Sequence, residues 1–88
     1  MWLSRAKGRK LLEVSAIATK FGQVIRSNRE LRGLSQEALA ELADLNRSYL
    51  GEIERGTTVP SIETMQKLAD ALNENLSALI GQCEKNDQ

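Results

Sequence analysis

The stretch QEALAELADLNRSYLGEIER, residues 36–55, decides the fold of this 88-residue chain. Apolar residues recur at helical spacing in its first part and place Leu39, Leu42 and Ala43 on one face. The pattern is then interrupted, and Asn46 can begin a second short helix as its N-cap. Two short helices joined by a turn of three or four residues form a helix-turn-helix.

The second helix of this stretch has an apolar side and a hydrogen-bonding side. We expect Leu50 and Ile53 to point inward. The side chains left to point outward can all form hydrogen bonds: Arg47, Ser48, Tyr49 and Glu52. A helix that reads base edges in the major groove needs such side chains, and an arginine matches the two acceptors of guanine. The pattern therefore predicts a DNA-reading helix.

Composition favours one small all-α domain. Aromatic residues make up 3% of the chain, so the core must be aliphatic, and one proline with few β-branched runs favours helices over a sheet. Helical spacing predicts five helices, the first from about Ser15 to Arg32 with an earlier start possible. The buried positions expected in the first and fourth helices are Phe21, Val24, Ile25, Leu31, Ile62, Met65, Leu68, Ala69 and Leu72.

Capping residues and turn residues support these helix boundaries. The expected N-caps of the second to fifth helices are Ser35, Asn46, Ser61 and Asn75. Residues expected to adopt positive φ at helix ends and turns are Gly33, Asp44, Gly56 and Asn73. We accordingly divide the chain into a basic N-terminal extension (1–14), a helix-turn-helix domain (15–83) and a polar tail (84–88).

Charge is unevenly distributed along a chain whose net charge is zero. Residues 1–32 hold eight basic and two acidic side chains, whereas residues 33–88 hold four basic and ten acidic ones. This asymmetry permits one positive face on a neutral molecule. The basic run of Arg5, Lys7, Arg9 and Lys10 is either an arm that contacts DNA or a solvated terminus.

Several classes of protein are disfavoured by what the sequence lacks. With no histidine and only Cys83, a structural zinc site and an internal disulfide are not expected, and no cofactor is predicted. No apolar run approaches the ~20 residues that span a bilayer, so we expect a cytoplasmic protein without membrane contact. No nucleophile–base spacing or phosphate-binding glycine loop suggests an enzyme. We expect no second domain and therefore no small-molecule effector.

The segment LSQEALAELADLNRSYLGEIERGTTVPSIETMQKLADAL resembles the phage repressor/Cro family of helix-turn-helix domains. The likeness extends from about Ile17 to Ile80 and includes the Ser35–Gln36 start, Ala40 and the Pro60–Ser61 pair. Within that family, LNRSYLGEIERG and the short length resemble controller proteins of restriction–modification systems. Short members of the family also serve as antitoxins and as phage or plasmid regulators.

The resemblance implies roles for particular residues. Gln36 would bind a phosphate, as its place at a helix N-terminus also suggests, and Arg29 would form a buried ion pair with Glu54. Arg55 and Thr57 would make further backbone contacts. The complete set of candidate DNA-binding residues is Gln36, Asn46, Arg47, Ser48, Tyr49, Glu52, Arg55 and Thr57. Two departures from the family pattern are Asp44, at a usual turn glycine, and Glu74, at a usually apolar position.

A single module of this kind buries about 600–1,000 Å² on DNA, which implies a homodimer on an inverted-repeat operator in double-stranded DNA. The candidate dimer surface is Leu76, Leu79 and Ile80. The alternative for these three residues is that they complete the monomer core. The alternative for the function is an antitoxin or co-regulator adaptor that uses the same fold mainly for protein–protein binding. An acidic or apolar reading helix would favour it. Arg47, Ser48 and Tyr49 argue against it, whereas the nearby acidic residues Glu52, Glu54 and Asp44 keep it open.

Overall fold

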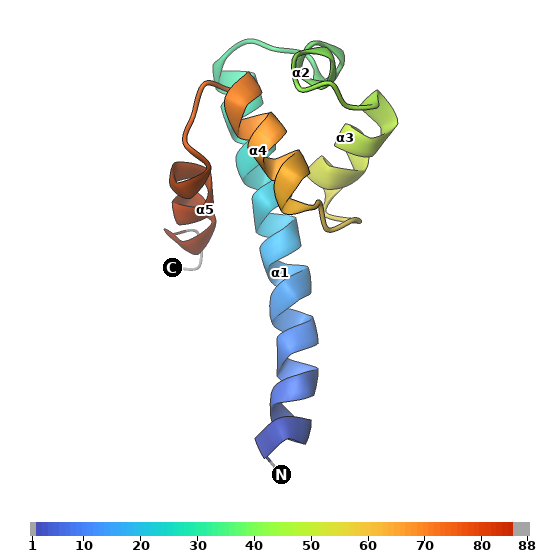
Figure 1. Cartoon of the computed structure of the whole chain (residues 1–88), viewed down its shortest axis with the longest axis vertical. Coiled ribbons are helices and arrows are strands. Elements are labelled where there is room, and N and C mark those ends of the chain that lie inside the picture. The colour runs from blue at the N-terminus through green and yellow to red at the C-terminus, as the bar shows by residue number, and fades with distance from the viewer. Residues whose placement is uncertain (1, 86–88) are drawn as a thin grey trace.

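The chain folds into five α-helices, as expected from the sequence. The computed structural model describes the backbone of residues 2–85 and the side chains of residues 16–84. The helices are α1 (Trp2–Leu31), α2 (Gln36–Leu42), α3 (Arg47–Arg55), α4 (Ile62–Ala71) and α5 (Leu76–Lys85). Figure 1 shows α2 to α5 gathered around the C-terminal half of α1, whose N-terminal half extends away from this body.

Helix α1 begins well before the expected start near Ser15. The expected boundary between the N-terminal extension (1–14) and the domain (15–83) therefore falls inside one continuous helix, and the division stays a prediction. The side chains of Arg5, Lys7, Arg9 and Lys10 lie outside the described residues, as does the tail from residue 86 onward. The two interpretations of the basic run, an arm that contacts DNA or a solvated terminus, both stay predictions.

Side-chain caps fix where α2 and α4 begin. The hydroxyl of Ser35 accepts a hydrogen bond from the Ala38 N–H at 3.0 Å, and the hydroxyl of Ser61 accepts one from the Thr64 N–H at 3.1 Å. Each cap satisfies one of the N–H groups that a helix N-terminus leaves without an intrahelical partner. The predicted starts of α2 and α4 are confirmed.

Left-handed residues separate the helices at the four expected places. Gly33 and Gly56 follow α1 and α3 with φ angles of 69° and 77°. Asp44, in the turn between α2 and α3, and Asn73, in the turn between α4 and α5, both have a φ of 57°. Each residue allows the chain to reverse direction within a few residues, which keeps α2 and α3 adjacent.

The core is aliphatic and receives side chains from every helix. Its largest fully buried side chains are those of Ile25, Leu39, Leu50, Ile53, Leu68, Leu72 and Leu79. Together they join all five helices into one cluster with Phe21 and Val24. Because α2 and α3 bury one side each in this cluster, their opposite sides face solvent.

Leu31 and Ile62, which were expected in the core, are exposed instead, and so is Leu42, which helical spacing placed on one face with Leu39. Leu31 is 85% exposed, Leu42 61% and Ile62 73%. Leu31 and Leu42 are the last residues of α1 and α2, and Ile62 is the first of α4. The terminal turn of each helix extends beyond the neighbouring helices against which the helix packs. The helical spacing of apolar residues continues into that turn, although its side chains face solvent.

Helix α1 meets the C-terminal end of α3 at Gly22. A Cβ atom at this position would overlap the Ile53 carbonyl oxygen and lie 2.8 Å from that of Glu54. Glycine in a helix interior usually destabilises the helix by about 1 kcal/mol. In the structure the missing side chain is what lets the two backbones touch, and this contact sets the position of α3.

Two polar contacts hold the C-terminal end of α1 to the chain that follows α4. The buried Asn28 donates to Gln82 Oε1 at 3.0 Å and to the Val24 carbonyl at 2.8 Å. Arg32 pairs with Glu74 at 3.5 Å. The ion pair gives Glu74 a partner at a position where the resemblance implied an apolar residue.

Candidate nucleic-acid interface

Helix α3 presents its hydrogen-bonding side to solvent. The Asn46 side-chain oxygen accepts from the N–H groups of Ser48 and Tyr49 at 2.8 and 3.3 Å, which begins the helix at Arg47. Leu50 and Ile53 are fully buried beneath it. The exposed residues that remain on α3 are Arg47, Ser48, Glu52 and Arg55.

An open polar cleft lies between α3 and the start of α2. We define the polar cleft by its lining residues, Gln36, Arg47, Ser48, Gly51, Glu52 and Arg55. Its volume of about 230 Å³ is below the roughly 300–1,000 Å³ of small-molecule pockets. Among the described residues neither of its arginines makes an ion pair. The cleft therefore offers two unpaired cations on an open surface.

Three expected DNA-binding residues are absent from the lining of the polar cleft. Asn46 uses its side-chain oxygen as the cap of α3. Tyr49 is half-buried and packs against the core, although it was expected to point outward. The Thr57 hydroxyl donates to the Glu52 carbonyl at 3.2 Å just beyond α3. All three lie at the ends or flank of α3, and their contacts with DNA stay predictions.

A buried ion pair supports the polar cleft from below. Arg29 Nε donates to Glu54 Oε2 at 2.7 Å and Arg29 Nη2 donates to Oε1 at 3.0 Å, so the pair is two-pronged. The third donor of Arg29, Nη1, bonds the Leu34 carbonyl at 2.9 Å. The two side chains are only 11% and 3% exposed. The hydrogen bond from Glu54 raises the pKa of Arg29, against the opposing effect of burial.

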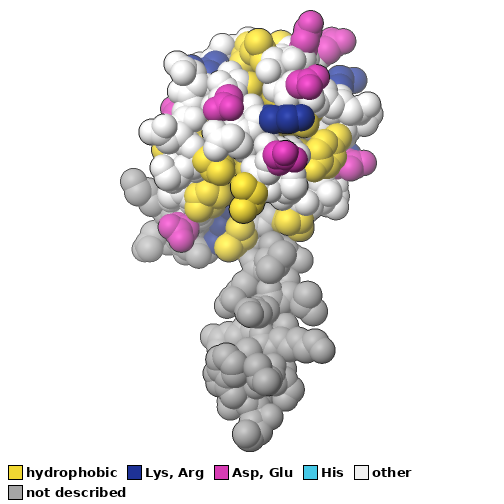
Figure 2. All heavy atoms as spheres, in the orientation of Figure 1, with side chains coloured by type: hydrophobic (Ala, Val, Ile, Leu, Met, Phe, Trp, Pro, Cys, Tyr) yellow, Lys and Arg dark blue, Asp and Glu magenta, His cyan; other side chains and the backbone are white. Residues whose placement is uncertain are grey.

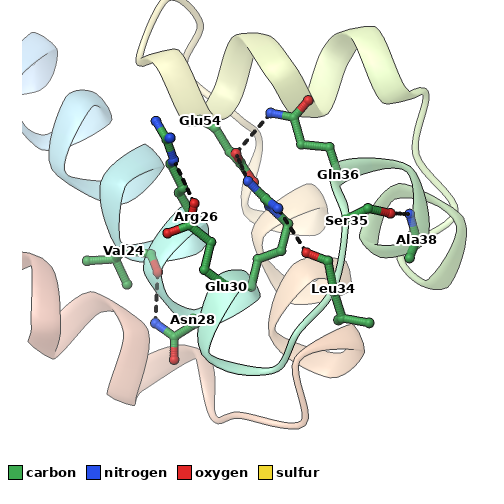
Figure 3. A network of polar contacts seen from close by, with 10 residues as sticks. Val24, Arg26, Asn28, Glu30, Leu34, Ser35, Gln36, Ala38 and Glu54 are labelled. Carbon is green, nitrogen blue, oxygen red and sulfur yellow. Dashed lines mark hydrogen bonds and ion pairs between the residues drawn. The ribbon is translucent and has the colours of Figure 1, made fainter.

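The same carboxylate holds Gln36 at the edge of the cleft. Gln36 Nε2 donates to Glu54 Oε1 at 2.9 Å, and Figure 3 shows this amide and Glu54 turned toward each other between α2 and α3. An amide nitrogen has two N–H donors, so one remains for an outside acceptor. Sequence reasoning assigned Gln36 and Glu54 to separate roles, and their contact was not foreseen.

A second exposed surface is apolar and shares no residue with the polar cleft. We define the apolar groove by its lining residues, Ile17, Ala18, Phe21, Val59, Pro60, Met65 and Ile80. They come from α1, the loop after α3, α4 and α5. Figure 2 shows hydrophobic side chains gathered low on the body. Val59 and Ile17 are 62% and 53% exposed.

The structure corrects part of the expected dimer surface. Leu79 has no exposed area and belongs to the monomer core, so its side chain cannot contact a second copy of the chain. Leu76 and Ile80 are half-buried, and Ile80 alone of the three lines the apolar groove. Cys83 is also buried, and burial raises the pKa of its thiol.

The described residues contain no metal-ligating cluster and no bilayer-length apolar helix. No three of the acidic, cysteine or histidine side chains among them gather at one point where they could hold an ion. Although α1 has 30 residues, neither it nor any shorter described helix is apolar enough to cross a bilayer.

Comparison with known proteins agrees with this geometry. A helix-turn-helix family model matches residues 25–79. The chain is 46% identical over 61 residues to the immunity repressor protein of Bacillus phage phi105, covering 69% of this chain and 42% of the repressor. It is 42% identical over 65 residues to control protein C.SmaI of Serratia marcescens, covering 73% of this chain and 77% of that protein.

A solved structure shares the fold. The restriction-modification controller protein C.AhdI from Aeromonas hydrophila superposes with a TM-score of 0.69 at 47% sequence identity. The match covers 70% of this chain and 94% of C.AhdI. This chain thus spans nearly the whole length of that controller protein but less than half the length of the phage repressor.

Proposed function

Because the chain belongs to the helix-turn-helix family of transcriptional regulators, we propose that it binds double-stranded DNA in a sequence-specific manner, as a homodimer on an inverted-repeat operator. The observation that carries this proposal is the polar cleft. It joins two unpaired arginines to Ser48 and Glu52 on the solvent side of α3. Such a surface can enter a major groove, whereas an acidic or apolar one would indicate a protein partner.

Each residue of the reading helix has a distinct part in this proposal. Arg47 donates two hydrogen bonds to the O6 and N7 of a guanine. Ser48 donates or accepts, and Glu52 accepts from a cytosine amino group or holds Arg47 in its bound rotamer. Tyr49 lies against a thymine methyl group or reaches a phosphate from the flank of α3.

Gln36 fixes the register of the complex. Its Nε2 donates one hydrogen to Glu54, and the other is free to donate to a phosphate oxygen where α2 crosses the backbone. A phosphate contact adds affinity and orientation but carries no sequence information. Thr57 and Asn46, at the two ends of α3, are placed for further contacts of the same kind.

The apolar groove is the surface on which we propose that two copies associate. An operator of two inverted half-sites needs a two-fold dimer, because the symmetry of the protein is repeated in the DNA. The groove combines exposed Ile17 and Val59 with Ile80 of the originally expected surface, and it leaves the polar cleft uncovered. The dimer would therefore leave both reading helices available to successive major grooves.

Among regulators, we assign the chain to the restriction–modification controller type. Its support is length as well as identity, since 94% of C.AhdI and 77% of C.SmaI are covered. A controller role predicts that the preferred binding site lies upstream of a restriction–modification gene pair. A site beside phage or plasmid genes would reassign the chain within the same family.

The test is selection of binding sites from a random duplex library with the purified protein, followed by titration of the preferred site at several salt concentrations. An enriched inverted repeat whose enrichment is lost in Arg47→Ala would support the proposal. The slope of affinity against salt would count the phosphates neutralised. If the library shows no enrichment and modest salt abolishes the weak binding that remains, the DNA-reading function is wrong and the adaptor alternative takes its place.

A further inference from the structure

Gly51 is a gap in the middle of the DNA-reading surface. It lies on α3 four residues after Arg47 and four before Arg55, so the three positions share one side of the helix. Glycine is a poor helix former, and the interior of a helix does not require it. The helix therefore does not require glycine at position 51, where the missing side chain leaves space on the side of α3 that carries Arg47 and Arg55.

The guanidinium of Arg55 fills that space. A Cβ atom at position 51 would lie 3.2 Å from Arg55 Nη1 and 3.9 Å from Gln36 Oε1. Arg55 thus turns back along α3 by one turn and lies over Gly51, inside the polar cleft with Arg47 and Ser48. The resemblance had implied a backbone contact for Arg55 at the C-terminal end of the helix.

We propose that Arg55 is a second base-reading arginine beside Arg47, positioned by the absence of a side chain at Gly51. Its guanidinium lies over the centre of the exposed side of α3, which faces the floor of a major groove. There its two-pronged donor matches the O6 and N7 of a guanine, as Arg47 does one turn earlier. Each half-site would then contain two guanines that are read by arginine. This inference rests on the proposed DNA-reading function.

Arg55→Lys separates base reading from a phosphate contact. Lysine keeps the positive charge but loses the planar fork. If Arg55 reads guanine, binding-site selection with this variant will show one relaxed position in each half-site, with a roughly 10- to 100-fold loss of affinity for the original operator and little change in the salt slope. If Arg55 contacts a phosphate, the preferred sequence will stay the same and Arg55→Ala will lower the salt slope by about one for each subunit.

Gly51→Ala tests the positioning directly. The added methyl group would lie 3.2 Å from Arg55 Nη1, so the guanidinium must shift by a few tenths of an ångström from its place over Gly51. We expect relaxation at the same base position as in Arg55→Lys, and no further loss when the two substitutions are combined, because both remove one interaction. Gly81→Ala is the matched control for stability, since its methyl group on α5 meets nothing within 4 Å.

The outcomes distinguish this inference from the function on which it rests. If the unmodified protein enriches no sequence, the proposed function fails. If it enriches an operator that depends on Arg47, while Arg55→Lys and Gly51→Ala keep the full base preference, only the role of Arg55 is overturned. Thermal unfolding of both variants, compared with Gly81→Ala, shows whether a loss of binding reflects a loss of folding.

Discussion

The polar cleft and the apolar groove are both exposed surfaces of one small body, and they are built in different ways. The polar cleft comes from one stretch of twenty residues, 36–55, and rests on a buried ion pair. The apolar groove draws on α1, the loop after α3, α4 and α5, and rests on the aliphatic core. Sequence spacing can therefore predict the cleft, whereas the groove exists only once the helices have packed.

The ion pair under the polar cleft gives the largest expected effect. Glu54→Ala would leave the Arg29 guanidinium buried without its carboxylate, and removing one partner of a buried pair costs about 3–5 kcal/mol. That is a large part of the 5–15 kcal/mol typical of a domain. Urea denaturation followed by circular dichroism measures the change in the free energy of unfolding.

The control for this prediction is an exposed ion pair on α1, the helix that carries Arg29. Arg26 and Glu30 bond at 3.2 Å but are 64% and 56% exposed. Glu30→Ala should change stability by only about 0.3–0.5 kcal/mol, because solvent screens the pair. Similar losses in Glu30→Ala and Glu54→Ala would show that burial gives the Arg29–Glu54 pair no special weight.

Arg47→Ala tests the reading side of the cleft without touching its support. The side chain is exposed and unpaired among the described residues, so we expect folding stability to change little. Loss of a two-pronged guanine contact should cost about 1–3 kcal/mol of discrimination in each half-site. Fluorescence anisotropy with the selected operator and a scrambled duplex measures that difference. An equal loss on both duplexes would mean that Arg47 contacts only the backbone.

Val59→Glu tests the apolar groove. Val59 is 62% exposed in the monomer, so glutamate there should leave the fold intact. In a two-fold dimer the substitution places two like charges in an apolar interface, and we expect the dimer dissociation constant to rise about tenfold or more. Sedimentation over a range of protein concentrations measures this constant.

Leu42→Glu is the matched control for the groove. Leu42 is 61% exposed, almost the same as Val59, but it lies at the end of α2 and does not line the groove. Its substitution should leave the dimer unchanged. If both variants dissociate equally, or neither does, the groove is not where two copies meet.

The sequence predicted those features that depend on interactions between residues close together in the chain. The caps at Ser35, Asn46 and Ser61 act within three residues, so their positions could be read directly. The prediction that Leu31 and Ile62 are buried was wrong, because the spacing of apolar residues carries no information on where a neighbouring helix ends. Leu79 could not be assigned to core or interface without the packed structure.

The candidate site shows the same limit. Arg47, Ser48 and Glu52 share a predictable helix side and do line one cleft. The bond from Gln36 to Glu54 and the placement of Arg55 over Gly51 join residues that only the final packing and rotamers bring together. A glycine inside a predicted reading helix was the one available signal, because nothing in the helix backbone demands it.

The smallest expected effects are those of substitutions at the two left-handed turn residues that are not glycine. Asp44 precedes the reading helix and Asn73 precedes α5, and both have a φ of 57°. A left-handed conformation costs an ordinary residue roughly 1–2 kcal/mol, less for aspartate and asparagine, while glycine loses about 0.5–1 kcal/mol of chain entropy. Asp44→Gly should therefore raise the free energy of unfolding by no more than about 1 kcal/mol, and Asn73→Gly by less, because asparagine tolerates this conformation better. Urea denaturation of both variants gives the two values. A clear loss of stability in Asp44→Gly alone would mean that the aspartate makes a contribution to the turn beyond its backbone conformation.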